Sequence, residues 1–410
     1  MSRHDSSTAE VPVIRLGPGA ASVERISGVV GGLGLLLCAA GYFWKPGEFF
    51  QSYLFAFLYW SGFALGGLGV LLLNNVVGGK WGVTIRRLLE AKMRTLPVVF
   101  LLLLPILLLG MPYLYPWISN GAHFPVPLSE ESRQILHHKA PYLNVPFFLI
   151  RVVLYFAIWL FWGYRVQKMT DEQDKTADPT LPVRLRQFSA PGLLIFTFTA
   201  SFAIFDWLLS SDAQFYSTVY GAMILIGDVL QTFALSIVVL ILISRPDRFG
   251  GRINAKLLHD LGNLMFAFTI FWTYLSASQL IIIWPADLPQ EIGWYLLRTR
   301  GFWKVLTWVV ALTMFGIPFL ALLSQARKRN PKRLIRVAVW LLVARAIDMF
   351  WIVEPTFRTK GFALYWTDIA AFIGVGGIWL YVYLGQLRRR PLLPLHDPRV
   401  AEPLPELATS

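Results

Sequence analysis

The sequence predicts an all-α polytopic membrane protein with about ten transmembrane helices. The chain of 410 residues is 56% hydrophobic and only 15% charged, which is less charge than a soluble protein of this length carries. Apolar runs of about 20 residues, long enough to cross a bilayer as a helix, recur along the whole chain. Backbone groups in lipid must form hydrogen bonds within the chain, so these runs are expected to be helices rather than open strands.

Ten such apolar runs occur along the chain. We expect helices over 26–43, 49–74, 95–115, 142–166, 191–212, 217–243, 258–284, 301–325, 332–352 and 364–386. The first 25 residues are polar and lack the apolar core of a signal peptide, so we expect them to remain as a tail.

Lys and Arg residues are concentrated in the two tails and in alternate connections. These connections are 80–94, 165–186, 245–256 and 327–336. The positive-inside rule then predicts that both termini are cytoplasmic. The net charge of +13 therefore reflects mostly topology. We interpret the run Arg388–Arg390 as a contact with anionic lipid, and we expect no nucleic-acid partner.

Several cofactor classes are excluded by residue types. Cys38 is the only cysteine, so no disulfide forms within the chain, and iron–sulfur clusters need several thiolates. No histidine lies deep in an apolar run, which excludes a di-haem cytochrome b. There is no phosphate-binding loop and no dinucleotide-binding motif. The "GGLG" sequences at 31–34 and 66–69 lie in apolar runs, where glycines are typical of close helix packing.

Four charged residues are predicted within the outer halves of their helices. They are Arg151, Asp206, Arg345 and Asp348. A charge at the bilayer centre costs about 2.5–3.5 kcal/mol on insertion scales, so each requires a reason. Arg345 and Asp348 are spaced i,i+3 and can meet on one helix face. Arg151 and Asp206 lie at matched depth on consecutive helices, so we expect two ion pairs.

A polar stripe is predicted on the sixth helix. Asp228, Thr232 and Ser236 recur at i, i+4 and i+8, with Gln231 beside them. Asp228 has no obvious basic partner in the sequence, which makes it the preferred proton site. The candidates for a proton path are Asp228, Thr232, Ser236, Gln231, Asp206 and Asp348. The alternative is that all these groups form structural ion pairs and interhelical hydrogen bonds, each worth about 0.6–2 kcal/mol.

An internal repeat is predicted, in which the bundle of helices 2–5 is echoed by the bundle of helices 6–9, because 147–168 and 302–328 share an aromatic start, a long apolar run and a basic end. The division is a tail (1–25), a peripheral helix (26–48), a first bundle of helices 2–5 (49–212), a second bundle of helices 6–9 (213–355), a second peripheral helix (356–386) and a tail (387–410).

Five long segments resemble one known family. They are "GGKWGVTIRRLLEAKM" (78–93), "HHKAPYLNVPFFLIRVVLYFAIW" (137–159), "FDWLLSSDAQFYSTVYG" (205–221), "DLGNLMFAFTIFWTYLSASQLIIIWPADLPQEIGWYL" (260–296) and "GIPFLALLSQARKRNP" (316–331). In this order they resemble the second NrfD-like membrane subunit, the ActF type, of alternative complex III. The resemblance covers most of residues 49–355.

The resemblance implies a fold of two four-helix bundles with two peripheral helices. It also implies a subunit of a quinol:cytochrome c (electron acceptor) oxidoreductase of an electron-transport chain. A sister NrfD-like subunit, an iron–sulfur subunit and haem c subunits would be its partners and would carry the haem and iron–sulfur groups. This subunit would bind no metal and no covalent cofactor, with quinone or quinol as a ligand, and would take part in proton translocation.

The sequence departs from that family at two places. The family pattern after "FDW" runs to an acid, proline, histidine and an aromatic residue, whereas this chain has Asp212, Ala213, Gln214 and Phe215. Where members have "HFxxPF", this chain has 314–319, "MFGIPF". Both histidines are lost, so a proton route here would depend on carboxylates.

Two other function classes stay open. A secondary transporter should have helices interrupted by glycine or proline at matched positions of its two halves, but Pro105 and Pro318 do not form a convincing matched pair. A structural membrane anchor for a peripheral redox module would differ from the family reading only in whether quinone or protons contact the subunit.

Overall fold

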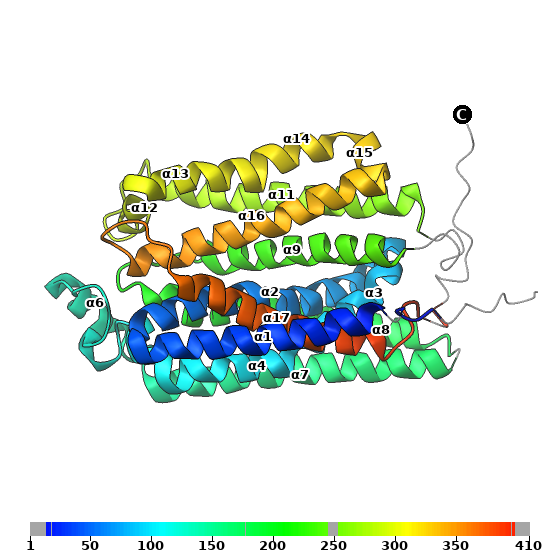
Figure 1. The fold of residues 1–410 in the computed structure, drawn as a ribbon, viewed down its shortest axis with the longest axis horizontal. Coiled ribbons are helices and arrows are strands. Elements are labelled where there is room, and N and C mark those ends of the chain that lie inside the picture. Colours follow the sequence, from blue (N-terminus) through cyan, green and yellow to red (C-terminus); the bar gives the residue numbers. More distant parts are fainter. Residues whose placement is uncertain (1–13, 18, 177, 245–252, 395, 398–410) are drawn as a thin grey trace, which may run out of the picture.

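The computed structural model describes residues 14–17, 19–176, 178–244, 253–394 and 396–397. Within these residues there are helices and no strands. The long helices run side by side along the long axis of the molecule (Figure 1). The prediction of an all-α polytopic membrane protein is thus confirmed.

The helices follow one another with short connections. They are α1 (Gly19–Trp44), α2 (Pro46–Val77), α3 (Lys80–Met93), α4 (Leu96–Pro105), η1 (Ile106–Gly110), α5 (Met111–Leu114), η2 (Ser119–Gly121), α6 (Glu130–Lys139), α7 (Val145–Lys175), α8 (Leu181–Trp207), η3 (Leu209–Ser211), α9 (Val219–Ile243), α11 (Ala255–Ile283), α12 (Ile292–Arg298), α13 (Gly301–Val310), η4 (Ala311–Gly316), α14 (Ile317–Leu323), α15 (Gln325–Arg329), α16 (Pro331–Phe357) and α17 (Trp366–Arg388).

Asparagine caps fix the starts of three long helices. The side-chain oxygens of Asn144, Asn254 and Asn330 accept hydrogen bonds from the backbone three residues on, at the starts of α7, α11 and α16. Such caps satisfy amide groups that have no partner inside the helix. α2 ends at Gly78, whose φ of +75° is in the left-handed region that favours glycine.

Nine helical segments in the described residues are long and apolar enough to cross a membrane. They are Gly19–Trp44, Pro46–Val77, Lys80–Leu114, Val145–Lys175, Leu181–Ser211, Val219–Ile243, Ala255–Ile283, Gly301–Leu323 and Trp366–Arg388. The remaining expected helix, the ninth (332–352), corresponds to α16, which has 27 residues and lies alongside the others (Figure 1). Arg345, Asp348 and Glu354 in its second half make it less apolar.

The third span differs from the expected one. We expected 80–94 to be an inner connection, but these residues form α3, and most of its side chains are buried. The spanning segment therefore begins at Lys80 rather than at residue 95. A search for apolar runs does not find this helix because it contains several basic residues. In the fold these basic residues are buried among neighbouring helices.

The most buried of the nine segments is α2. It packs against α1 and α17 and against α3, α8, α9 and α16. Helices of both expected bundles thus share α2 as a common neighbour. The division into two bundles at residue 212 stays a prediction.

Glycines permit the close approach of α2 to α9. An added Cβ on Gly66 would lie 2.5 Å from the Asp228 carbonyl oxygen. On the other side of the molecule α1 meets α17 in the same way, and a Cβ on Gly34 would lie 2.7 Å from the backbone of Gly374. Both "GGLG" sequences therefore contain close-packing positions, as expected.

Two spans contain a π-helical turn. η1 directly follows Pro105, and η4 is followed by Pro318. Proline has no amide hydrogen, so the helix around it must adjust its hydrogen bonds. η1 lies in the third span and η4 in the eighth, so they occupy different places in the two expected bundles.

We predict that Gly66→Ala lowers the thermal stability of the detergent-solubilised protein. The new methyl group would overlap the Asp228 carbonyl, and overpacking of this kind costs about 1–3 kcal/mol. Gly32→Ala is the matched control, because nothing lies within 4 Å of its added Cβ. Equal melting temperatures of the two variants would show that the α2–α9 contact does not need glycine.

Candidate functional site

A buried arginine of α16 lies between two carboxylates. Arg345 Nη2 lies 3.1 Å from Asp228 Oδ1 on α9, and Arg345 Nη1 forms a short ion pair with Asp348 on its own helix. All three side chains are almost fully buried. The guanidinium lies directly against Gly227, where a Cβ would come 2.8 Å from Nε. We call Asp228, Arg345 and Asp348 the charge triad.

The expectation that Asp228 lacks a basic partner was wrong. The pair of Arg345 with Asp348 was predicted from its i,i+3 spacing and is present. The pair of Arg345 with Asp228 joins two helices that are far apart in the sequence. Only the packing of α16 against α9 brings them together, and helix periodicity says nothing about that packing.

The predicted stripe continues from the triad along α9. Gln231 Nε2 donates to the Tyr59 carbonyl at 3.2 Å, and Ser236 Oγ donates to the Thr232 carbonyl at 2.7 Å. Gln231, Thr232 and Ser236 are all buried. Gln231 Oε1, Thr232 Oγ1 and Asp348 Oδ1 have no hydrogen-bond partner within the described part of the chain. These oxygens can therefore form hydrogen bonds in addition to those within the stripe.

A lysine from α3 meets this stripe, and the sequence analysis missed it. Lys92 Nζ donates to the Thr232 carbonyl at 2.8 Å and to Ser236 Oγ at 2.6 Å. Lys92 is fully buried, and its Cβ lies beside Gly67 of α2. We had counted Lys92 among the basic residues of an inner connection. Lys92 comes close to Gly67 and Ser236 only when α3 packs against α2 and α9, so its contacts could be found only once these helices are placed.

Arg151 and Asp206 form the second predicted ion pair. Arg151 Nε and Nη2 donate to the two Asp206 oxygens at 2.8 and 2.9 Å, and Tyr155 Oη donates to Asp206 Oδ2 at 2.8 Å. The Arg151 guanidinium also lies 3.9 Å from the centre of the Tyr142 ring. Asp206 thus has a bidentate partner and a third donor, and its negative charge is matched by one positive charge.

A second arginine with two carboxylates lies where α16 ends and α17 begins. Arg358 Nη2 lies 2.9 Å from Glu354 Oε2 and 2.7 Å from Asp368 Oδ1. Ser52 of α2 donates to Asp368 at 2.6 Å. Burial lowers the pKa of the Arg358 guanidinium, but Glu354 and Asp368 more than offset this, so its pKa is raised overall. This cluster ties the ends of three helices together.

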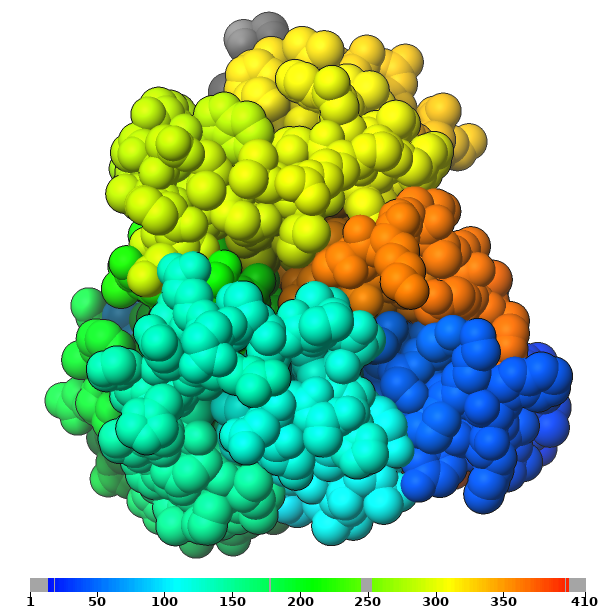
Figure 2. Space-filling model, turned by 90° about the vertical axis from the view of Figure 1, so that its left-hand side faces the viewer, coloured from blue at the N-terminus to red at the C-terminus, as the bar shows by residue number. Residues whose placement is uncertain are grey.

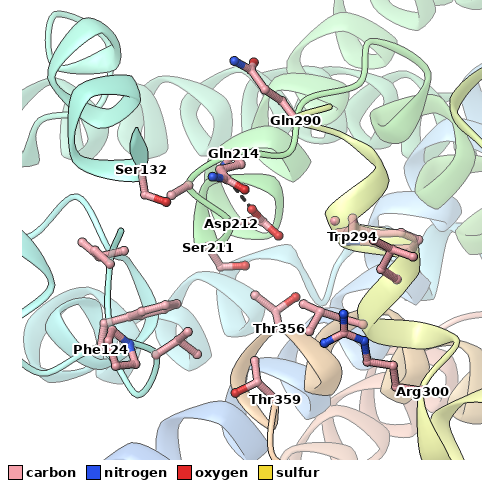
Figure 3. Close-up of a pocket in the computed structure, with 17 residues that line it drawn as sticks. Phe124, Ser132, Ser211, Asp212, Gln214, Gln290, Trp294, Arg300, Thr356 and Thr359 are labelled. Atoms are coloured by element: carbon pink, nitrogen blue, oxygen red, sulfur yellow. Dashed lines mark hydrogen bonds between the residues drawn. The ribbon is translucent and has the colours of Figure 1, made fainter. Parts of the chain in front are cut away.

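A pocket of about 300 Å³ opens at the predicted outer end of the molecule. Figure 2 shows this end face on, with the segment that precedes α7 in cyan and the segment around α12 in yellow. In Figure 3 Ser211, Asp212 and Gln214 lie between Phe124 on one side and Trp294 and Arg300 on the other. The pocket thus combines aromatic walls with polar groups.

Arg298 lies buried at the end of α12, beside the pocket residue Trp294. Its guanidinium lies 3.5 Å from the centre of the Trp294 ring. Burial lowers the pKa of Arg298 to about 10, although Tyr220 and Asp212 act in the opposite direction. Tyr220 of α9 is buried, and its ring centre lies 6.1 Å from that of Trp294.

An ion cluster holds the predicted inner end together. Glu90 of α3 accepts from Arg86 at 3.1 Å and from Arg87 at 2.6 Å. Arg86 also bonds Asp397 in the C-terminal segment at 2.9 Å. In the part of the chain that the structure describes, no group of three or more His, Cys, Asp or Glu side chains could hold a metal ion.

No protein-family model matches the sequence, and no curated protein matches it.

We predict that Arg151→Met destabilises the protein more than the double change Arg151→Met, Asp206→Asn. Removal of one partner of a buried pair leaves an uncompensated charge and costs about 3–5 kcal/mol, whereas the double variant leaves a neutral amide. The measurement is a double-mutant cycle on thermal unfolding in detergent. Arg336→Met, at an exposed arginine of α16, is the control. Additive effects of the two changes would contradict the pairing.

Proposed function

We propose that this chain is an integral membrane subunit of a quinol:electron acceptor oxidoreductase of the alternative complex III type, and that it conducts protons through the helices around α9. The observation that carries the proton role is the charge triad, in which Arg345 is shared by Asp228 and Asp348 in the buried part of the helix bundle.

The triad has an unbalanced charge. Two carboxylates and one guanidinium leave one negative charge, and one added proton neutralises it. Burial of a net charge is costly in a protein interior. One carboxylate can therefore take up a proton while the other keeps its ion pair with Arg345. A group that gains and loses one proton without losing its position is what a proton carrier requires.

The pair of Arg151 with Asp206 is charge-balanced, and it supports the structural interpretation for that site. Arg151 and Tyr155 together donate three hydrogen bonds to the Asp206 carboxylate. We therefore place the proton path on Asp228, Asp348, Gln231, Thr232 and Ser236, and we assign Asp206 a role in joining α7 to α8.

The assembly follows from the resemblance of the five long segments. These segments cover α3, the junction of α8 with α9, and α11, which lie around the polar stripe. In the proposed complex a sister NrfD-like subunit, an iron–sulfur subunit and haem c subunits carry the electrons. The outer pocket has the aromatic walls and polar groups that suit a quinol ring. The bacterial inner membrane and cytoplasmic termini remain part of this proposal.

The competing classes lack a specific supporting observation. A secondary transporter is expected to break its helices at matched positions, whereas η1 and η4 lie at unmatched places of the two expected bundles. A purely structural anchor gives no reason for an unbalanced triad of buried charges, because a balanced pair would join the helices at lower cost.

We expect the chain, purified from its native membrane in mild detergent, to bring with it a second multi-pass subunit, an iron–sulfur protein and haem c proteins. Haem c absorbance and mass spectrometry of the purified complex are the measurements. A stable preparation of this chain alone, with no redox subunits under several detergent conditions, would overturn the assembly.

We expect Asp228→Asn to lower the number of protons taken up per quinol oxidised when the complex is reconstituted in liposomes. The amide keeps a hydrogen-bond acceptor for Arg345 but cannot carry the proton. Asp287→Asn is the matched control, since Asp287 is exposed and has a positive φ that asparagine also adopts. If Asp228→Asn leaves the number of protons per quinol unchanged, the proposed proton role is wrong, whereas the proposed assembly is not affected.

A further inference from the structure

Lys92 is a buried basic residue that forms no ion pair within the described part of the chain. The two hydrogen bonds that it donates go to neutral oxygens, the Thr232 carbonyl and Ser236 Oγ. The other buried cations described above have a carboxylate or an aromatic face beside them. Burial of an unpaired ammonium away from water is costly. A position that needed only a hydrogen-bond donor would be filled at lower cost by serine or asparagine.

The helices packed around Lys92 place no carboxylate of the described chain within ion-pair distance of it. α3 packs against α2, α9, α11 and α17, and no described carboxylate of these helices forms an ion pair with Lys92. On α3 itself, Glu90 is already held by Arg86 and Arg87, in the inner ion cluster. From α2 the neighbour is Gly67, whose missing side chain leaves room for the lysine stem. From α9 the neighbours are Thr232 and Ser236.

The contacts of Ser236 suit both protonation states of Lys92. When Lys92 is an ammonium, it donates to Ser236 Oγ, and the Ser236 hydroxyl donates to the Thr232 carbonyl, as observed. When Lys92 is a neutral amine, its lone pair can accept, and the same hydroxyl can rotate to donate to it. Either state therefore keeps a hydrogen bond between the two side chains.

The stripe continues from Lys92 to the charge triad. Thr232 follows Asp228 by one helical turn, and Gly66 of α2 lies against both the Thr232 hydroxyl and the Asp228 carbonyl. Thr232 Oγ1 is buried and has no hydrogen-bond partner in the described part of the chain. The Asp228 carboxylate lies farther along α9, against Gly62 of α2. The hydroxyls of Ser236 and Thr232 therefore belong to the stretch of α9 between the Lys92 contact and the acid.

We infer that Lys92 is the proton-exchanging group that loads the charge triad from the predicted inner side. This inference rests on the proton role proposed above and assigns its donor. The Lys92 ammonium releases one proton, which passes along the Ser236 and Thr232 hydroxyls to the Asp228 carboxylate. Lys92 is then a neutral amine and Asp228 a neutral acid, and Lys92 takes one proton from water at the inner side. Lysine can release a proton in this way, whereas arginine stays charged.

The test uses two substitutions of Lys92 in the reconstituted complex, one that removes the charge and one that keeps it. Lys92→Met leaves a neutral side chain of similar length, and Lys92→Arg keeps a charge that is not released. Both are expected to lower the protons taken up per quinol oxidised to the level of Asp228→Asn, while quinol oxidation in uncoupled liposomes continues. Lys304→Met, at an exposed lysine of α13, is the control and is expected to keep the full ratio.

The outcomes separate the two proposals. A full ratio in Lys92→Arg would overturn the inference, because it would show that Lys92 supplies only a fixed charge. A full ratio in Lys92→Met would overturn it as well. If Asp228→Asn also keeps the full ratio, the proton role itself fails. Should neither Lys92 variant assemble, Ser236→Ala gives the same test: it removes the intervening hydroxyl, and an unchanged proton uptake rate would contradict the route.

Discussion

The close contact of α2 with α9 is the constraint on which the buried polar groups depend. α9 brings Asp228, Gln231 and Thr232 into the interior on one face, and a membrane gives such groups no water. Gly62 and Gly66 of α2 remove the side chains that would otherwise fill this space. The polar face is therefore enclosed by protein backbone instead of lipid. α16 then adds Arg345, and α3 adds Lys92, on the remaining sides.

The ion clusters around Asp206 and Asp348 have a similar sequence spacing but a different charge balance. Asp206 precedes Asp212 by six residues, and Asp348 precedes Glu354 by six. In each case the first acid binds an arginine within the bundle and the second lies nearer the predicted outer end. The arginine of α7 serves one carboxylate, whereas Arg345 serves two. This difference in charge balance, rather than the presence of acids, separates a structural joint from a proton carrier.

Sequence reasoning predicted the features that depend on local pattern. Apolar length located the spans, and the i,i+3 rule located the pair of Arg345 with Asp348. It failed where the partner is distant in sequence. Asp228 was predicted to be unpaired because α16 lies more than one hundred residues away, and Lys92 was assigned to a connection because its segment is rich in charge, whereas it lies in a buried helix. Both errors come from packing between helices, which a single sequence does not encode in its periodicity.

The pairing of α1 with α17 has a consequence for biosynthesis. α1 is the first long helix of the described chain and α17 the last, and they join at Gly34 and Gly374. Beyond them, the Leu392 amide bonds the Ile14 carbonyl at 2.8 Å. A chain made from its N-terminus therefore carries the glycine face of α1 without its α17 partner until the helices between them have been made. Docking of α17 then covers that face, so the close packing of the first described helix is completed only by the last.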